Sequence, residues 1–83
     1  MAYYQILYWQ DIPSQVKAWD DFDEVRVELE PRFMARIDKV AQEAGWTSAD
    51  DYLAKWNWSE PQERDGDPDE VAAAVKKELE AQY

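Results

Sequence analysis

The sequence predicts an α+β fold in which a three- or four-stranded, mainly antiparallel sheet packs against two or three helices. Three observations support this prediction. The first thirty residues contain short apolar or alternating runs separated by turn-forming residues. Residues 31–44 and residues 68–79 instead repeat apolar residues at helical spacing. Because 83 residues suffice for one domain and are too few for two, we expect a single α+β domain over residues 1–83.

The three predicted strands follow one another as an antiparallel meander. Residues 3–9 carry apolar side chains on both faces, which is typical of a strand in the middle of a sheet. A turn is expected at residues 11–14, which combine a proline with aspartate and serine, before a second short strand at residues 15–19. A polar turn at residues 20–23 leads into residues 25–29, where apolar and charged residues alternate.

Helical periodicity begins at Pro31, in a first-turn position where the missing N–H of proline costs nothing. Gly45 is suited to end this helix, and Thr47 is suited to begin a second, shorter one. The apolar stripe of the first helix consists of Phe33, Ile37, Val40, Ala41 and Ala44. The second helix would bury Tyr52, Leu53 and Trp56.

Residues 56–66 allow two interpretations. The alternation over Trp56-Asn57-Trp58-Ser59 favours a fourth strand, whereas Pro61 and the polar residues after it favour a loop or an edge strand. The start of the final helix is better defined, because Asp67 is a suitable N-cap and Pro68 suits the first position. Its buried stripe would contain Val71, Val75 and Leu79.

The net charge of −10 is unevenly distributed along the chain. Residues 1–30 carry a net charge of −5, residues 31–46 carry +1, and residues 47–83 carry −6. Such a field repels phosphate backbones and anionic lipids, so we expect no nucleic-acid partner and no membrane partner. It also favours a soluble monomer. No apolar run approaches the roughly 20 residues of a membrane-spanning helix, and we expect a cytoplasmic protein.

The residue types most often used for catalysis and metal binding are missing. The sequence contains no cysteine and no histidine, which removes thiolate nucleophiles, the usual general base and the commonest metal ligand. Asp65, Asp67 and Asp69 have the spacing of a calcium loop, but the loop positions that need glycine and glutamate hold Glu70 and Lys76. We therefore expect no enzyme, no cofactor and no metal site.

The leading hypothesis is a protein-interaction or accessory module that binds an unidentified protein. Five tryptophans are many for so thin a core, so we expect at least one in an exposed partner-binding patch. The helix at residues 31–44 also carries a basic stripe, which either docks an acidic partner or anion, or pairs with neighbouring acids. The candidate partner-binding residues are Trp19, Arg32, Arg36, Lys39, Trp56 and Trp58.

Two other function classes stay open. One is a small-ligand-binding protein or an enzyme that uses aspartate, glutamate, lysine or tyrosine, which would require a deep apolar pocket with an inward-facing carboxylate. The other, less favoured, is an acidic mimic of nucleic acid, which would require regularly spaced acids on one face.

Several short motifs resemble those of a small bacterial family called "virulence factor" domain proteins. The matching residues are Tyr8-Trp9, Ile12-Pro13-Ser14-Gln15-Val16, Arg32-Phe33, Ile37-Asp38, Tyr52 and Trp56. The resemblance spans nearly the whole chain, and its most specific part is the run at residues 12–16. A similar domain is attached to helical HEAT-type repeats in larger conserved virulence factors, so the resemblance implies an interaction module. It implies no catalytic or binding residues.

Overall fold

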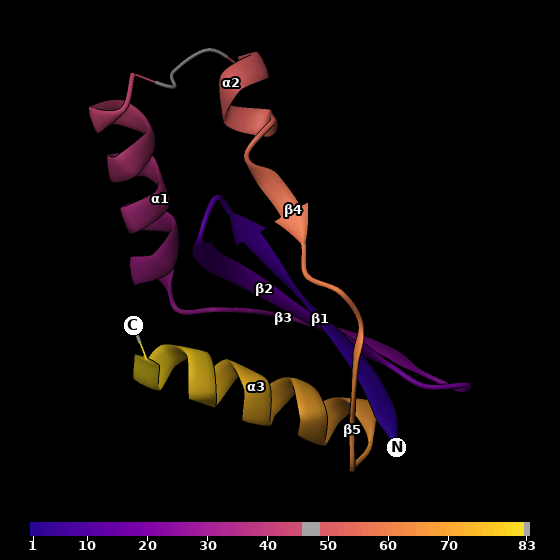
Figure 1. The fold of residues 1–83 in the computed structure, drawn as a ribbon. Coiled ribbons are helices and arrows are strands. Elements are labelled where there is room, and N and C mark those ends of the chain that lie inside the picture. The colour runs from indigo at the N-terminus through magenta and orange to yellow at the C-terminus, as the bar shows by residue number, and fades with distance from the viewer. Residues whose placement is uncertain (46–48, 83) are drawn as a thin grey trace.

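A computed structural model describes residues 1–45 and 49–82. These residues form an antiparallel sheet of five strands and three helices, which confirms the predicted α+β fold class. In chain order the elements are β1 (Ala2–Trp9), β2 (Ile12–Trp19), β3 (Glu24–Glu28), α1 (Pro31–Glu43), α2 (Ala49–Leu53), β4 (Trp56–Trp58), β5 (Gln62–Arg64) and α3 (Pro68–Gln82). In Figure 1, α3 lies along the sheet, whereas α1 and α2 lie at the end that carries the β1–β2 hairpin.

The strand β1 occupies the centre of the sheet, as its apolar sequence predicts. On one side it pairs with β2, which in turn pairs with β3, and both pairings are antiparallel. On the other side it pairs with two short strands in succession, β4 near its C-terminal end and β5 near its N-terminal end. The sheet is therefore four strands wide, in the order β3–β2–β1–β4, with β5 on the same edge as β4.

The predicted turn at residues 11–14 is placed too late, since Asp11 lies in the turn whereas residues 12–14 belong to β2. The chain reverses at Gln10, which has a positive φ of 57°, and β2 already begins at Ile12. The pairing of β2 with β1 is irregular around Pro13 and Ser14, where β2 contains one residue more than its partner. A strand tolerates proline at such a bulge because the ladder of hydrogen bonds is interrupted there. Pro13 therefore marks a bulge within a strand and not a turn between strands.

The two interpretations of residues 56–66 are both partly correct. The segment forms two strands, and Pro61 lies in the gap between them. Ser59 holds this gap against β1: its N–H donates to the carbonyl of Ile6 (2.9 Å), and its Oγ accepts the N–H of Ile6 (2.8 Å). Gln5 adds a third bond, from Nε2 to the carbonyl of Ser59 (2.9 Å). A serine hydroxyl thus replaces a backbone carbonyl where proline interrupts the edge.

The larger part of the core lies between α3 and one face of the sheet. The helix packs across β1, β2 and β3, and its apolar residues recur at the predicted helical spacing. The side chains buried here are Ala2, Ile6, Val16 and Ala18 from the sheet, and Val71, Ala72, Val75 and Leu79 from α3. Because burial of apolar area stabilises by about 25 cal/mol per Å², this contact is one of the main stabilising layers of the fold.

A second part of the core lies at the hairpin end, around Trp9. This side chain is fully buried, and its Nε1 donates a hydrogen bond to the carbonyl of Tyr52 (2.9 Å). The Tyr52 ring lies 5.6 Å from the ring of Trp9 and meets Trp56 edge-on at 6.0 Å, measured between centroids. From α1, the residues Phe33, Ile37 and Ala41 are buried. This aromatic group anchors α2 to the sheet.

The helix ends follow their predicted signals wherever the structure describes them. Gly45 has a φ of +76°, a left-handed conformation that suits glycine after α1. The Oδ1 of Asp67 accepts the N–H of Glu70 (2.9 Å), so Asp67 caps α3. The predicted start of the second helix at Thr47 lies outside the described residues, as does Trp46.

We predict that Ser59→Ala lowers the free energy of unfolding by about 1–2 kcal/mol, because the N–H of Ile6 loses its acceptor in a partly buried position. Urea denaturation followed by circular dichroism measures this change. Ser14→Ala is the matched control, since Oγ of Ser14 donates to the weak acceptor Sδ of Met34 at 3.5 Å. Equal losses in the two variants would contradict the assigned role of Ser59.

Candidate functional site

The face of the sheet that points away from α3 stays accessible to solvent over much of its length. Side chains alternate between the two faces of a sheet, so every second residue of β1, β2 and β3 belongs to it. Two of its aromatic side chains, Tyr3 and Trp58, are 44% and 39% exposed. We call this surface the open face, and its residues are Tyr3, Gln5, Leu7, Gln15, Lys17, Trp19, Glu24, Arg26, Glu28, Trp58 and Glu63.

A lysine and three aromatic rings meet on the open face. Nζ of Lys17 lies 5.2 Å from the ring centroid of Trp19 and 4.9 Å from that of Trp58. The Trp19 ring stacks on Tyr3, with 6.0 Å between centroids and 26° between planes. An ammonium group over an aromatic face gains about 0.5–1 kcal/mol at an exposed site. These four residues, which we call the aromatic–lysine cluster, join strands β1, β2 and β4.

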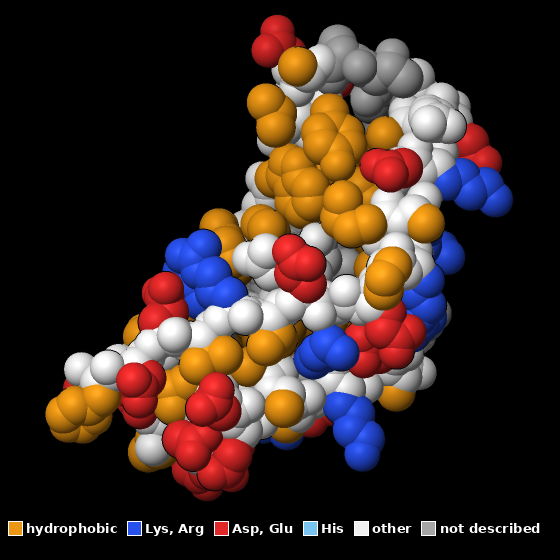
Figure 2. Space-filling view, turned by 180° about the vertical axis from the view of Figure 1, so that it is seen from behind, with side chains coloured by type: hydrophobic (Ala, Val, Ile, Leu, Met, Phe, Trp, Pro, Cys, Tyr) orange, Lys and Arg blue, Asp and Glu red, His pale blue; other side chains and the backbone are white. Residues whose placement is uncertain are grey.

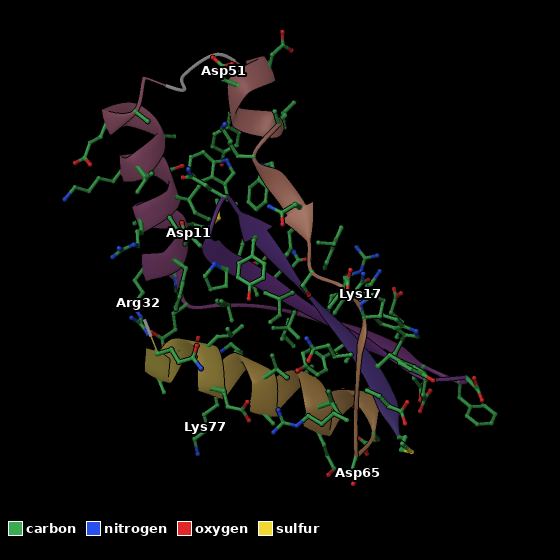
Figure 3. All side chains as sticks on the ribbon, in the orientation of Figure 1. Asp11, Lys17, Arg32, Asp51, Asp65 and Lys77 are labelled. Carbon is green, nitrogen blue, oxygen red and sulfur yellow. The ribbon has the colours of Figure 1, made fainter. Side chains whose placement is uncertain are left out.

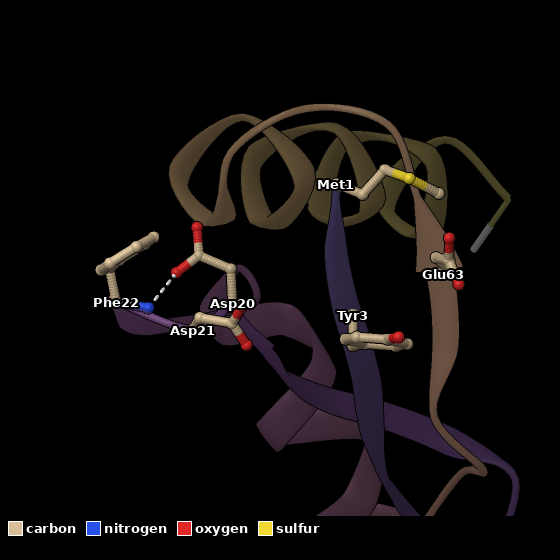
Figure 4. Close-up of a pocket in the computed structure, with 6 residues that line it drawn as sticks. All are labelled: Met1, Tyr3, Asp20, Asp21, Phe22 and Glu63. Carbon is tan, nitrogen blue, oxygen red and sulfur yellow. Dashed lines mark hydrogen bonds between the residues drawn. The ribbon is translucent and has the colours of Figure 1, made fainter.

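A hollow of about 410 Å³ adjoins this cluster at the end of the sheet that carries the β2–β3 turn. Its lining residues, drawn in Figure 4, are Met1, Tyr3, Asp20, Asp21, Phe22 and Glu63. Phe22 is 91% exposed, an unusual position for a phenylalanine. The hollow therefore combines aromatic surface with three carboxylates.

The turn beside this hollow is fixed by Asp20. Its Oδ1 accepts the backbone N–H groups of Phe22 and Asp23, both at 2.8 Å. These two hydrogen bonds, first the one from Phe22 and then the one from Asp23, hold the pKa of Asp20 below its ordinary value. The turn is thus a local hydrogen-bonded structure, and it presents Phe22 to solvent.

The structure divides the six predicted partner-binding residues into separate groups. Trp19 and Trp58 meet in the aromatic–lysine cluster. Trp56 is half-buried in the hairpin-end core, where α2 covers it, although it lies only two positions from Trp58. Arg36 and Lys39 are exposed on α1, an element that contributes no residue to the open face.

Arg32 has a structural role at the junction of α1 and α3. Its Nε pairs with Glu30 Oε2 at 2.9 Å, and its Nη2 donates to the carbonyl of Glu80 at 2.6 Å. Its guanidinium also lies 4.6 Å from the Phe33 ring centroid. Figure 3 shows Arg32 at this junction, on the other side of the molecule from Lys17. Pairing with neighbouring acids, one of the two interpretations of the basic stripe, therefore holds for Arg32.

Tyr3 and Lys17 of the aromatic–lysine cluster, and Phe22 of the adjoining hollow, are not among the residues predicted from the sequence. The signal for Lys17 was present, since Gln15, Lys17 and Trp19 alternate with residues that α3 buries. Tyr3 was harder to assign, because β1 is apolar on both faces and its sequence alone does not reveal which face a helix covers.

Outside the open face, Arg64, Glu78 and Tyr52 have pKa values that their surroundings shift. The described part of the chain contains no group of three or more acidic side chains that could hold a metal ion. Arg64 makes two hydrogen bonds to Glu78 (3.1 and 2.6 Å), which lower the pKa of Glu78 and join β5 to α3. Burial, followed by the charge of Asp38, raises the pKa of Tyr52, so its phenol stays protonated at neutral pH.

Comparison with known proteins places the chain in a family. The model of a family described as "Virulence factor" matches residues 7–83. The chain belongs to this family. The match includes Lys17, Trp19 and Trp58, and it begins after Tyr3. Searches of curated proteins and of solved structures found no match. None of the helices described in this virulence factor domain is long and apolar enough to cross a membrane.

We predict that Asp20→Ala destabilises this virulence factor domain at pH 7 and much less at low pH. Because the folded-state pKa of Asp20 is lowered, its stabilising effect is complete above the ordinary pKa of 3.8 and disappears as the pH falls through the folded-state value. Thermal unfolding measured from pH 7 down to pH 2 tests this. Asp21→Ala, in the same turn, is the control; a loss that is independent of pH would contradict the prediction.

Proposed function

We propose that this virulence factor domain is a protein-interaction module that docks a partner protein on its open face. The observation that carries the proposal is the aromatic–lysine cluster, in which Tyr3 and Trp58 remain 44% and 39% exposed. Tryptophan and tyrosine are enriched among the residues that dominate binding energy at protein interfaces. A monomeric domain gains nothing in folding from aromatic surface left in water, so a binding role explains it better.

A non-enzymatic, cytoplasmic role fits this proposal. The sequence offers neither histidine nor cysteine for acid–base or nucleophilic chemistry. The hollow beside the open face is lined by carboxylates of which Asp20 has a lowered pKa, whereas general acid catalysis needs a raised one. These facts support an accessory module that acts through binding.

The basic residues of α1 provide a competing docking surface, and the test must separate the two. The bait is the whole chain, used for affinity capture from lysate of the source cells with quantitative mass spectrometry. Trp19→Ala/Trp58→Ala removes two rings of the open face. Arg36→Ala/Lys39→Ala removes two exposed basic side chains of α1 and serves as the matched variant.

We predict that a partner captured by the wild type falls by about tenfold or more with the tryptophan variant and by less than about twofold with the α1 variant. Circular dichroism and thermal unfolding verify that both variants are folded. Loss of the partner with the α1 variant alone would move the docking site to α1. Undiminished capture by the tryptophan variant would contradict the proposal.

A further inference from the structure

We infer that the partner segment bound by the open face is basic, with lysine or arginine side chains that contact the aromatic rings and the carboxylates around them. The inference rests on the proposed function and adds the chemistry of the partner. The evidence for it is the arrangement of charges on the open face, together with the exposed rings of Tyr3 and Trp58.

The cross-strand register places acids on both sides of the aromatic pair. Tyr3 lies opposite Trp19 across β1 and β2; beyond them, Glu24 lies opposite Trp19 and Glu63 lies opposite Tyr3. One row across the sheet therefore reads Glu24, Trp19, Tyr3, Glu63. Glu24 already pairs with Arg26, so the acid of this row left for a partner is Glu63. A cationic head group placed over the Tyr3 ring has the Glu63 carboxylate beside it, which combines cation–π attraction with an ion pair.

The basic residues of the open face are already engaged. Arg26 Nε lies 3.5 Å from Oε2 of Glu24, and the ammonium of Lys17 lies over Trp19 and Trp58. The carboxylates of Asp21, Glu28 and Glu63 are exposed on or beside the open face. The charge offered to a partner is therefore negative.

The adjoining hollow also offers both carboxylates and apolar surface to a basic segment. Its carboxylates come from Asp20, Asp21 and Glu63, and its apolar surface comes from Met1, Tyr3 and Phe22. Lysine and arginine side chains complement this lining, because their apolar stems can contact the apolar surface while their charged ends face the carboxylates. In Figure 2, acidic and hydrophobic side chains lie intermixed over the end of the sheet that carries the β2–β3 turn.

The alternative occupants fit less well. An acidic partner would meet the carboxylates of the open face, and the net charge of −10 would slow its approach. A second copy of this chain carries the same charge and is repelled in the same way. A basic segment gains from both the local and the overall field.

Substitution of Lys17 distinguishes a basic partner segment from an acidic one. Its ammonium occupies the ring faces that a partner cation would use. Replacing it with glutamine keeps a polar side chain of similar length, frees the rings and makes the face more negative. Lys17→Gln should therefore tighten the binding of a basic segment, whereas it would weaken the binding of an acidic one.

The experiment uses two capped ten-residue peptides, one alternating lysine with serine and the other alternating glutamate with serine. Binding to the whole chain is measured by tryptophan fluorescence and by NMR chemical-shift changes at low salt. The variants are Lys17→Gln and Asp21→Asn/Glu63→Gln. The control is Glu43→Gln/Asp69→Asn, which removes the same charge from the end of α1 and the start of α3.

We expect the lysine peptide to bind about tenfold more tightly than the glutamate peptide. Lys17→Gln should strengthen its binding by about threefold, Asp21→Asn/Glu63→Gln should weaken it by about threefold, and the control should change it by less than about 1.5-fold. Shift changes should map to the open face.

Binding of neither peptide, preference for the glutamate peptide, or weaker binding by Lys17→Gln would each overturn the inference. Equal effects of the two double variants would also overturn it, since they would show attraction to net charge alone. The proposed function is tested separately. If the peptide results contradict the inference but Trp19→Ala/Trp58→Ala still loses the cellular partner, the open face is a docking site for a segment of different chemistry.

Discussion

The burial of one sheet face against α3 is the constraint on which the rest of this structure depends. A chain of 83 residues buries only about three-fifths of its unfolded surface, and of its three helices only α3 packs across β1, β2 and β3 together. That helix packs on the face that carries Val16 and Ala18. The short helix α2 reaches only the hairpin end, where it covers Trp9. The other residues on the face of the sheet opposite α3, which form the open face, must therefore be compatible with water.

The open face meets this requirement by mixing aromatic and charged side chains. Lys17 is half-buried and holds its ammonium over two indole rings. Carboxylates from β3, β5 and the β2–β3 turn surround the rings and limit the size of any continuous apolar patch. The same mixture also provides a surface with a defined charge. The stability of the fold and the proposed docking surface both depend on which face of the sheet α3 covers.

The fold was largely predictable because local signals dominate it. Pro31 and Asp67 mark helix starts, and alternation marks the strands. The bulge at Pro13 was not predictable, since a proline before polar residues favours a turn unless the opposite strand is known. The role of Ser59 was likewise hidden, because its partner lies more than fifty positions away along the chain. The site was predicted only in part: tertiary contacts decide that Trp58 is exposed while neighbouring Trp56 is covered.

The most direct test of an exposed aromatic face compares Trp58 with Trp9 in solution. NMR spectra of the tryptophan side chains, assigned by single Trp→Phe substitutions, can be recorded with a soluble paramagnetic agent that broadens signals near the surface. An open face predicts strong broadening for Trp58 and little for Trp9, which is fully buried. If the signals of Trp58 were as protected as those of Trp9, the open face would be covered in solution and the proposed docking surface would be excluded.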